Sequence, residues 1–389
     1  MKSRNYSLII IFSASFFFAL FTALTAYIDS SFLIEFYGLS DKWVGGLYII
    51  GSILALFGLL ILPRYLIQLS VKKLTIGLLL LQALSIIGLV MTPSIIVGIL
   101  SFIIYVALVS LIYLMTDIFV AHYTNEENTG RVRGAEYTVL NSAWVIAPFI
   151  AGFIANSSLG YRGVYWLGLL MIILMFFIVF FLLSDITYTN RHTMTIIQSL
   201  KHYFQKKELR DVFFSSYLLQ FFYAVMVIYS PIYLHSHIGL GWDMIGIIFT
   251  IMLLAYPLFQ YILGRISDLY LGEKELLITG YGIIIITTII FAFMTTTHWW
   301  VWAVVLFIMR IGTATIEIMH ESYFFKHIDD KHPDAISIYR SSYPVARIIV
   351  PIIVFIILIL TASYNIIFLV LATIMLFGII INSYLKDTK

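Results

Sequence analysis

Two arginines lie inside long apolar stretches of this chain, where a charged side chain is costly. Arg310 follows Trp299 by about eleven residues and Arg347 follows Ala335 by about twelve, so at about 1.5 Å per residue both are predicted near the middle of a bilayer. No acidic residue reaches that predicted depth. A guanidinium is always charged and binds carboxylates or phosphates through parallel hydrogen bonds, so the pair indicates an anionic substrate. The alternative is a structural role, in which each arginine pairs with a carbonyl, a tyrosine or a nearby acid.

Four titratable side chains are candidates for binding a coupling ion. Glu317, His320 and Glu321 follow Arg310 in the same apolar segment, and Asp29 lies near the end of the first segment. Histidine titrates near neutrality, so one hypothesis is a proton relay through His320 and Glu321. The alternative is that His320 only faces water, while the acids form ion pairs that hold one end of the protein closed. Glu317 is seven residues after Arg310, on the same face of a helix, so a partial pair between them is also predicted.

Three uncharged polar residues are predicted at intermediate depth, and they are candidates for contact with a substrate: Gln220, Asn141 and Tyr343. Each could line a pathway, or could join two helices by a hydrogen bond worth about 0.6 kcal/mol. The sequence contains no Walker loop, no GxSxG elbow, no HExxH motif and no cysteine. It therefore predicts neither an ATP-driven pump nor an enzyme, and neither a cofactor nor a metal site.

Composition places these residues in a membrane protein. Hydrophobic residues make up 61% of the chain and charged residues 11%, against roughly 25% charged residues in soluble domains. A helix needs about 20 apolar residues to cross a bilayer. We count twelve such segments, at 7–34, 42–63, 72–92, 95–122, 134–156, 163–184, 211–236, 242–263, 274–297, 299–323, 335–360 and 363–385.

The basic residues predict how these segments are oriented. With both termini in the cytoplasm, all of the 23 lysines and arginines except five fall on the cytoplasmic side, as the positive-inside rule requires. Lys42 and Arg162 fall outside, and Arg310, Arg340 and Arg347 lie within segments. We therefore expect a multi-pass protein of the cytoplasmic membrane. The basic residues occupy short loops between apolar segments, so they do not indicate a nucleic-acid partner.

A repeat at an offset of 201 residues relates the two halves of the chain. Seven identities follow it: Gly38 and Gly239, Leu39 and Leu240, Gly45 and Gly246, Ile50 and Ile251, Ile61 and Ile262, Leu62 and Leu263, and Arg64 and Arg265. Repeats of this kind are common in transporters. They predict an all-α membrane protein of twelve transmembrane helices in two pseudo-symmetric bundles of six, at 1–184 and 211–389. The polar segment 185–210 is predicted to be a cytoplasmic linker.

The loop after Ile262 and Leu263 resembles a signature of the major facilitator superfamily. It reads G-R-I-S-D from Gly264 and is similar to the Gly-x-x-x-Asp pattern between the second and third helices of each half of that family. Asp117, followed by Arg131 and Arg133, resembles the acid-loop-arginine element that precedes the fifth helix. The first-half copy of the loop departs from the pattern, because it has neither the glycine nor the aspartate. The resemblance implies gating roles for seven residues: Gly264, Arg265, Asp268, Gly272, Arg131, Arg133 and Asp117.

The resemblance also implies a secondary active transporter that works as a monomer by alternating access, usually with protons as the coupling ion. From the two arginines we predict a small organic anion as substrate. The alternatives are an exporter of amphipathic or lipid-like compounds and, in another class, a sensor or scaffold that has the fold without transport. The degenerate first-half loop keeps this last alternative open. A membrane enzyme that acts on lipids would need a cluster of acids and histidines at one interface, for which Glu317, His320 and Glu321 are the only candidates.

Overall fold

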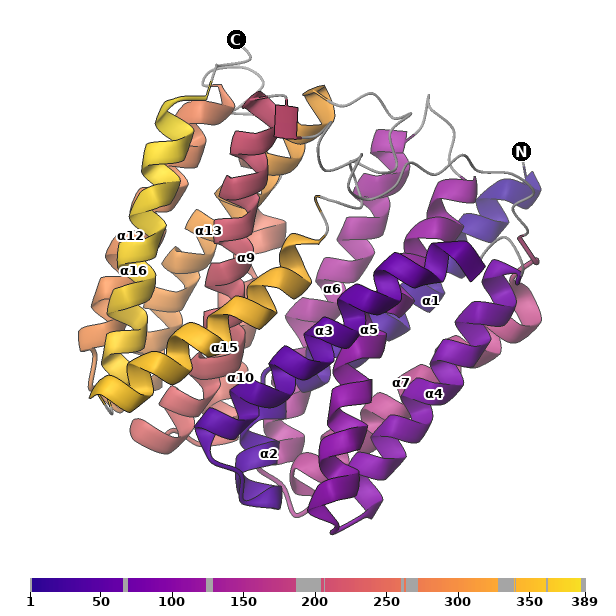
Figure 1. The fold of residues 1–389 in the computed structure, drawn as a ribbon, viewed down its shortest axis with the longest axis horizontal. Coiled ribbons are helices and arrows are strands. Elements are labelled where there is room, and N and C mark those ends of the chain that lie inside the picture. Colours follow the sequence, from indigo (N-terminus) through magenta and orange to yellow (C-terminus); the bar gives the residue numbers. More distant parts are fainter. Residues whose placement is uncertain are drawn as a thin grey trace. The chain divides into compact units, whose positions relative to one another are not determined.

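The computed structural model describes residues 2–65, 69–123, 129–186, 204–205, 207–259, 262–263, 272–327, 339, 341–361 and 363–385. These residues are helical apart from short turns and loops (Figure 1), and no strand occurs among them. The first half contains α1 (Lys2–Ala26), α2 (Asp29–Tyr37), α3 (Asp41–Tyr65), α4 (Val71–Met91), α5 (Ile95–Tyr123), α6 (Thr129–Ala155) and α7 (Gly160–Leu182). The second contains α9 (Lys207–Ile232), η2 (Tyr233–His237), α10 (Trp242–Leu253), α12 (Glu273–Phe293), α13 (Trp299–His327), α15 (Ser342–Thr361) and α16 (Tyr364–Ser383).

Most of these helices are long and apolar enough to cross a membrane. Among the described residues eleven candidate spans occur, from Ser7–Ala26 to Tyr364–Ser383, and Trp43–Leu59 in α3 is a shorter apolar helix. Many of their large side chains, such as Phe181 and Leu360, are exposed on the outside of the protein. Such surface is costly in water and suits contact with lipid. The predicted all-α membrane fold is therefore confirmed.

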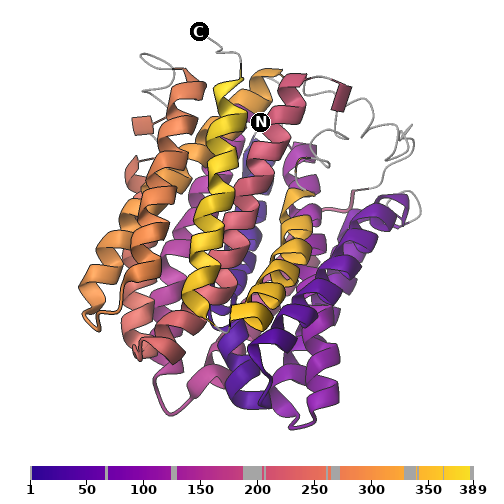
Figure 2. The same cartoon turned by 60° about the vertical axis from the view of Figure 1, so that its left-hand side comes forward.

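The chain forms two compact units, Met1–His192 and Thr193–Lys389, and each repeats the same helix contacts. In unit 1, α1 contacts α5, α6 and α7, while α5 contacts α3 and α4, and α7 contacts α4 and α6. In unit 2, α9 contacts α13, α15 and α16, while α13 contacts α10 and α12, and α16 contacts α12 and α15. Figures 1 and 2 show α12 beside α16 in unit 2. Taken in chain order, the six long helices of each unit have the same neighbours, so the predicted pair of pseudo-symmetric bundles is confirmed.

The two turn glycines of the sequence repeat have the same backbone conformation. Gly38 ends α2 at a φ of 67°, and Gly239 follows η2 at a φ of 84°. In unit 1 the Leu39 N–H donates to the Leu33 carbonyl, and in unit 2 the Leu240 N–H donates to the Leu234 carbonyl. Both bonds are of the kind that closes a helix around a left-handed residue, a conformation that glycine adopts without strain. The repeat therefore extends to single hydrogen bonds at the predicted offset of 201.

Three of the predicted segments are interrupted or shortened, each at a residue that weakens a helix. The first segment, expected at 7–34, is divided into α1, which ends at Ala26, and α2, which begins at Asp29. Just before this break, the Thr22 and Thr25 hydroxyls donate to carbonyls of the preceding turn, a contact that weakens a helix. The π-helix η2 begins two residues after Pro231, and the helix of α10 is interrupted at Leu254, one turn before Pro257. A proline lacks the N–H that an uninterrupted helix needs, and one lies close to each of these two irregularities.

The eleventh predicted segment begins later than expected. We placed its start near Ala335, whereas α15 begins at Ser342 and Ser341 lies in a turn. Pro344 falls in the first turn of α15, where its missing N–H is not required. Arg347 consequently lies in the second turn of α15. Residues 335–338 lie outside the described part of the chain, so its predicted depth in the bilayer stays a prediction.

Candidate functional site

Four residues of unit 2 form what we call the Glu317 cluster: Arg310, Glu317, Tyr223 and Tyr256. The Tyr223 hydroxyl donates to Oε2 of Glu317 at 2.9 Å, and the Tyr256 hydroxyl donates to the same oxygen. The two hydroxyl oxygens are 2.6 Å apart. The Arg310 guanidinium carbon lies 4.3 Å from the centre of the Tyr256 ring and 4.8 Å from that of Tyr223. Both distances are within the range of cation–π attraction. The predicted association of Arg310 with Glu317 thus takes place through two shared tyrosines.

Three segments position this cluster. Arg310 and Glu317 project from α13, two turns apart, and Tyr223 comes from α9, which packs against α13. Tyr256 lies in the helical turn after the interruption at Leu254, close to Pro257. Tyr256 is buried, while Arg310, Glu317 and Tyr223 are half-buried, so part of the cluster reaches the surface of unit 2.

Unit 1 contains a second buried carboxylate, in what we call the Asp29 cluster: Thr25, Asp29, Tyr105 and Tyr165. The Tyr165 hydroxyl donates to Oδ1 of Asp29 at 2.6 Å, and the Tyr105 hydroxyl lies 3.2 Å from Oδ2. The Thr25 hydroxyl is 2.5 Å from that of Tyr105. Asp29 is the first residue of α2, and the tyrosines come from α5 and α7, which both contact α1. Asp29 therefore lies inside unit 1 and is 4% exposed, rather than at the end of one continuous helix.

His320 does not face bulk solvent, so the alternative of a histidine that only faces water outside the protein is wrong. Its side chain is fully buried, and its Nε2 lies 2.5 Å from the Ser215 hydroxyl of α9. Arg347 lies over the ring of Tyr343, with its guanidinium carbon 4.6 Å from the ring centre. Asn141 in α6, Gln220 in α9 and Asp117 in α5 are half-buried. Asn141 and Asp117 belong to unit 1, and Gln220 belongs to unit 2.

Most of the predicted gating residues lie beyond what the structure describes. Gly264, Arg265 and Asp268 fall outside the described residues. Arg131 and Arg133 lie in α6 and Glu321 lies in α13, but the placement of their side chains is outside the description. Gly272 is described and precedes α12 as its N-terminal cap. Their gating and coupling roles therefore stay predictions.

The tyrosines that surround both carboxylates are not among the residues predicted from the sequence. The chain has 26 tyrosines spread over nearly every segment, and tyrosine is common at membrane surfaces. The presence of a tyrosine therefore does not by itself identify a functional site. A usable signal was the position of Tyr223 inside an apolar span. A phenol there needs a hydrogen-bond partner, and an acid on a neighbouring helix can supply one.

Comparison with known proteins gives a family and a fold. The family model described as Major Facilitator Superfamily matches residues 7–245 and 212–388, which together cover nearly the whole chain. No curated protein matches. Among solved structures, a mutant form of the nucleoside transporter NupG matches with a TM-score of 0.79 at 13% identity, covering 97% of this chain and 99% of that one. A second NupG structure matches with a TM-score of 0.76 at 14% identity, covering 97% and 98%. At these identities the two structures show a shared fold.

Proposed function

Because the chain belongs to the major facilitator superfamily, we propose that it is a secondary active transporter that moves a small solute across the cytoplasmic membrane. Transport would occur by alternating access of the two bundles, which the segment 185–210 would join on the cytoplasmic side. Both termini would also be cytoplasmic, as the positions of the basic residues favour. We propose that the protein carries out this function as a monomer.

The Glu317 cluster supports a solute site that is polar and close to neutral in charge. Arg310 lies over two tyrosine rings whose hydroxyls both donate to Glu317, so a guanidinium and a carboxylate share one small network. A site that contained only the guanidinium would attract anions, but a nearby carboxylate offsets that attraction. This observation favours an uncharged solute that offers hydrogen-bonding groups and a planar ring. Nucleosides have this chemistry and are the first solutes to test, since the structurally similar transporters carry that name.

A small organic anion is the second candidate, and a specific observation favours it. Unit 2 has a second arginine in an apolar span, Arg347, which lies over Tyr343. Protonation of Glu317 would remove its negative charge and leave the Arg310 charge without that compensation. An anion would then bind together with a proton. An amphipathic compound, the third candidate, would depend on ring and apolar contacts and would not require either charge.

Proton coupling is proposed at Glu317, with Asp29 as a second carboxyl group of the same kind. A phenol oxygen can accept a hydrogen bond as well as donate one. A proton added to Glu317 could therefore be donated to Tyr223 or Tyr256 without any new partner. Intramembrane acids are costly unless they are paired or functional. Both carboxylates thus have surroundings that can accommodate the ionised and the neutral form.

The experiment is uptake into proteoliposomes made with the purified full-length protein, with panels of nucleosides, organic anions and amphiphiles, with and without an inward proton gradient. A thermal-shift screen with the same compounds gives an independent readout, since a ligand at 100 times its Kd adds about 2.7 kcal/mol of stability. Uptake of a nucleoside that requires Glu317 supports the proposal. Uptake of anions alone would establish the second candidate instead. Stabilisation by amphiphiles alone would overturn both, and no uptake of any compound would favour a sensor or scaffold.

A further inference from the structure

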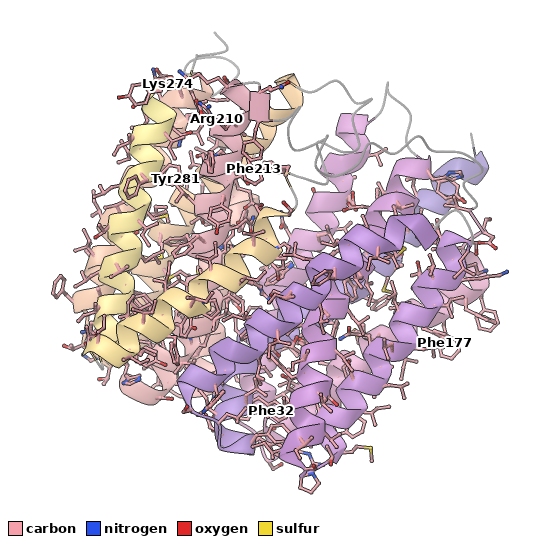
Figure 3. The ribbon with its side chains drawn as sticks, viewed as in Figure 1. Phe32, Phe177, Arg210, Phe213, Lys274 and Tyr281 are labelled. Carbon is pink, nitrogen blue, oxygen red and sulfur yellow. The ribbon has the colours of Figure 1, made fainter. Side chains whose placement is uncertain are left out.

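One serine hydroxyl lies at a junction of four helices in unit 2, in what we call the Ser215 cluster: Ser215, Tyr281, His320 and Asn382. These residues come from α9, α12, α13 and α16. The helices form a closed ring of contacts, because α9 contacts α13, α13 contacts α12, α12 contacts α16 and α16 contacts α9. The Ser215 oxygen lies 2.5 Å from Nε2 of His320, 2.7 Å from Nδ2 of Asn382 and 3.1 Å from the Tyr281 hydroxyl. All four side chains are fully buried, and Figure 3 labels Tyr281.

Two backbone carbonyls fix most of the protons in this cluster. The Tyr281 hydroxyl donates to the Ser215 carbonyl at 2.7 Å, and Nδ2 of Asn382 donates to the Gly378 carbonyl at 2.6 Å. A carbonyl only accepts, so the orientation of the Asn382 amide is determined. The second proton of Nδ2 then points to the Ser215 oxygen. The Ser215 hydroxyl keeps one proton of its own, and the Nε2 of His320 is the nearer of its two possible acceptors.

This assignment makes His320 a neutral imidazole with its remaining proton on Nδ1. Within the described part of the chain, Nδ1 of His320 and Oδ1 of Asn382 are buried and have no hydrogen-bond partner. One is a donor and the other is an acceptor. Each is two covalent bonds from an atom that contacts the same Ser215 oxygen. A buried polar group without a partner is costly, and native proteins satisfy nearly all of them, often with water.

We propose that the Ser215 cluster binds water, which accepts from Nδ1–H of His320 and donates to Oδ1 of Asn382. Water is the smallest molecule that can both accept and donate, and buried waters usually make about three bonds to such groups. With water bound, every polar atom of the cluster has a partner. His320 is then a positioning residue, fixed in one tautomer, that holds α13 in register with α9. The positioning role of His320 rests on the proposed function, because the register of the two helices places Tyr223 of α9 against Glu317 of α13.

The presence of this water is tested by nuclear magnetic resonance. The full-length protein is labelled with ¹⁵N at its nine histidines and placed in lipid nanodiscs. The difference from His320→Gln assigns the signals of His320. We expect a protonated Nδ1 with a cross-peak to water, an unprotonated Nε2 that accepts a hydrogen bond, and no change between about pH 6 and pH 8. An assigned Nδ1 without a water cross-peak, or an imidazolium in that range, would overturn the proposal. Neither result depends on transport. The test therefore remains valid even if the proposed transport function is wrong.

Two serine variants test the positioning role. Ser215→Ala removes the shared hydroxyl, and Ser216→Ala is the matched control, because Ser216 is an equally buried neighbour outside the cluster. We expect Ser215→Ala to lower the Tm by about 2–4 °C, to lose the Nδ1-to-water cross-peak and to alter the pH profile of transport. We expect Ser216→Ala to leave the cross-peak and the profile unchanged. Equal effects of the two variants, or a pH profile unmoved by Ser215→Ala, would show that Ser215 does not position Glu317.

Discussion

The Tyr223 hydroxyl on α9 donates to the Glu317 carboxylate on α13 over 2.9 Å. The bond joins two residues that are 94 positions apart in the chain, and the ring of the same tyrosine lies against Arg310. One phenol therefore links an acid and a base that are two turns apart on α13. Any change in the charge of Glu317 acts directly on the group that also contacts Arg310.

Glu317→Gln should abolish uphill uptake and leave downhill exchange intact, because an amide accepts hydrogen bonds from the tyrosines but cannot take up a proton. The measurement compares gradient-driven uptake with counterflow in proteoliposomes. Glu35→Gln is the control, because Glu35 also accepts a bond from a tyrosine, Tyr161, but is exposed. Equal loss of uptake and counterflow in Glu317→Gln would indicate a structural role for the acid.

Arg310→Lys should weaken solute binding by roughly twofold to thirtyfold, because an ammonium cannot reproduce planar stacking on two rings, and such contacts contribute about 0.5–2 kcal/mol. Binding is measured by isothermal titration with the solute found in the uptake screen. Arg347→Lys is the comparison variant, since Arg347 lies over a single ring. A larger effect at Arg347 than at Arg310 would move the solute site away from the Glu317 cluster.

Tyr165→Phe should destabilise unit 1 by about 1–3 kcal/mol, because it removes a donor to the buried Asp29 and leaves the carboxylate less satisfied. The change in the free energy of unfolding is measured by denaturant or thermal unfolding in detergent. The matched control is Tyr161→Phe, which removes the same hydroxyl from the exposed Glu35 and should change stability by less than about 1 kcal/mol. Similar losses of unfolding free energy in both variants would mean that the burial of Asp29 does not determine how much the hydrogen bond contributes to stability.

Gly38→Ala and Gly239→Ala should each destabilise the protein by about 1–2 kcal/mol, since their positive φ values disfavour any side chain. No atom lies near enough to contact an added methyl group at either position, so the cost comes from the backbone alone. Gly77→Ala is the control, because Gly77 lies in α4 with equally open surroundings and an ordinary helical backbone. That variant should be neutral or more stable. A shift in Tm of the same sign for all three would contradict the argument.

The sequence alone was sufficient for the class, the repeat and most of the segments. Apolar runs of about 20 residues can satisfy their backbone in lipid only as helices, so composition and length determine this part of the fold. The offset of 201 predicted the glycine turns because a left-handed residue restricts the sequence at one position. Pro231 and Pro257 can likewise be read from the sequence, and they lie close to the π-helix η2 and to the interruption that follows α10.

Only the tertiary structure decided which polar groups meet. Arg310 and Arg347 looked equivalent in the sequence, yet one lies against two tyrosines and an acid, and the other over one ring near the start of α15. The periodicity of an apolar helix is weak, because lipid-facing and buried side chains are both hydrophobic. The sequence therefore does not show which face of α9 meets α13. Tyr223, Tyr256 and Ser215 became site residues only once the packing of the helices was known.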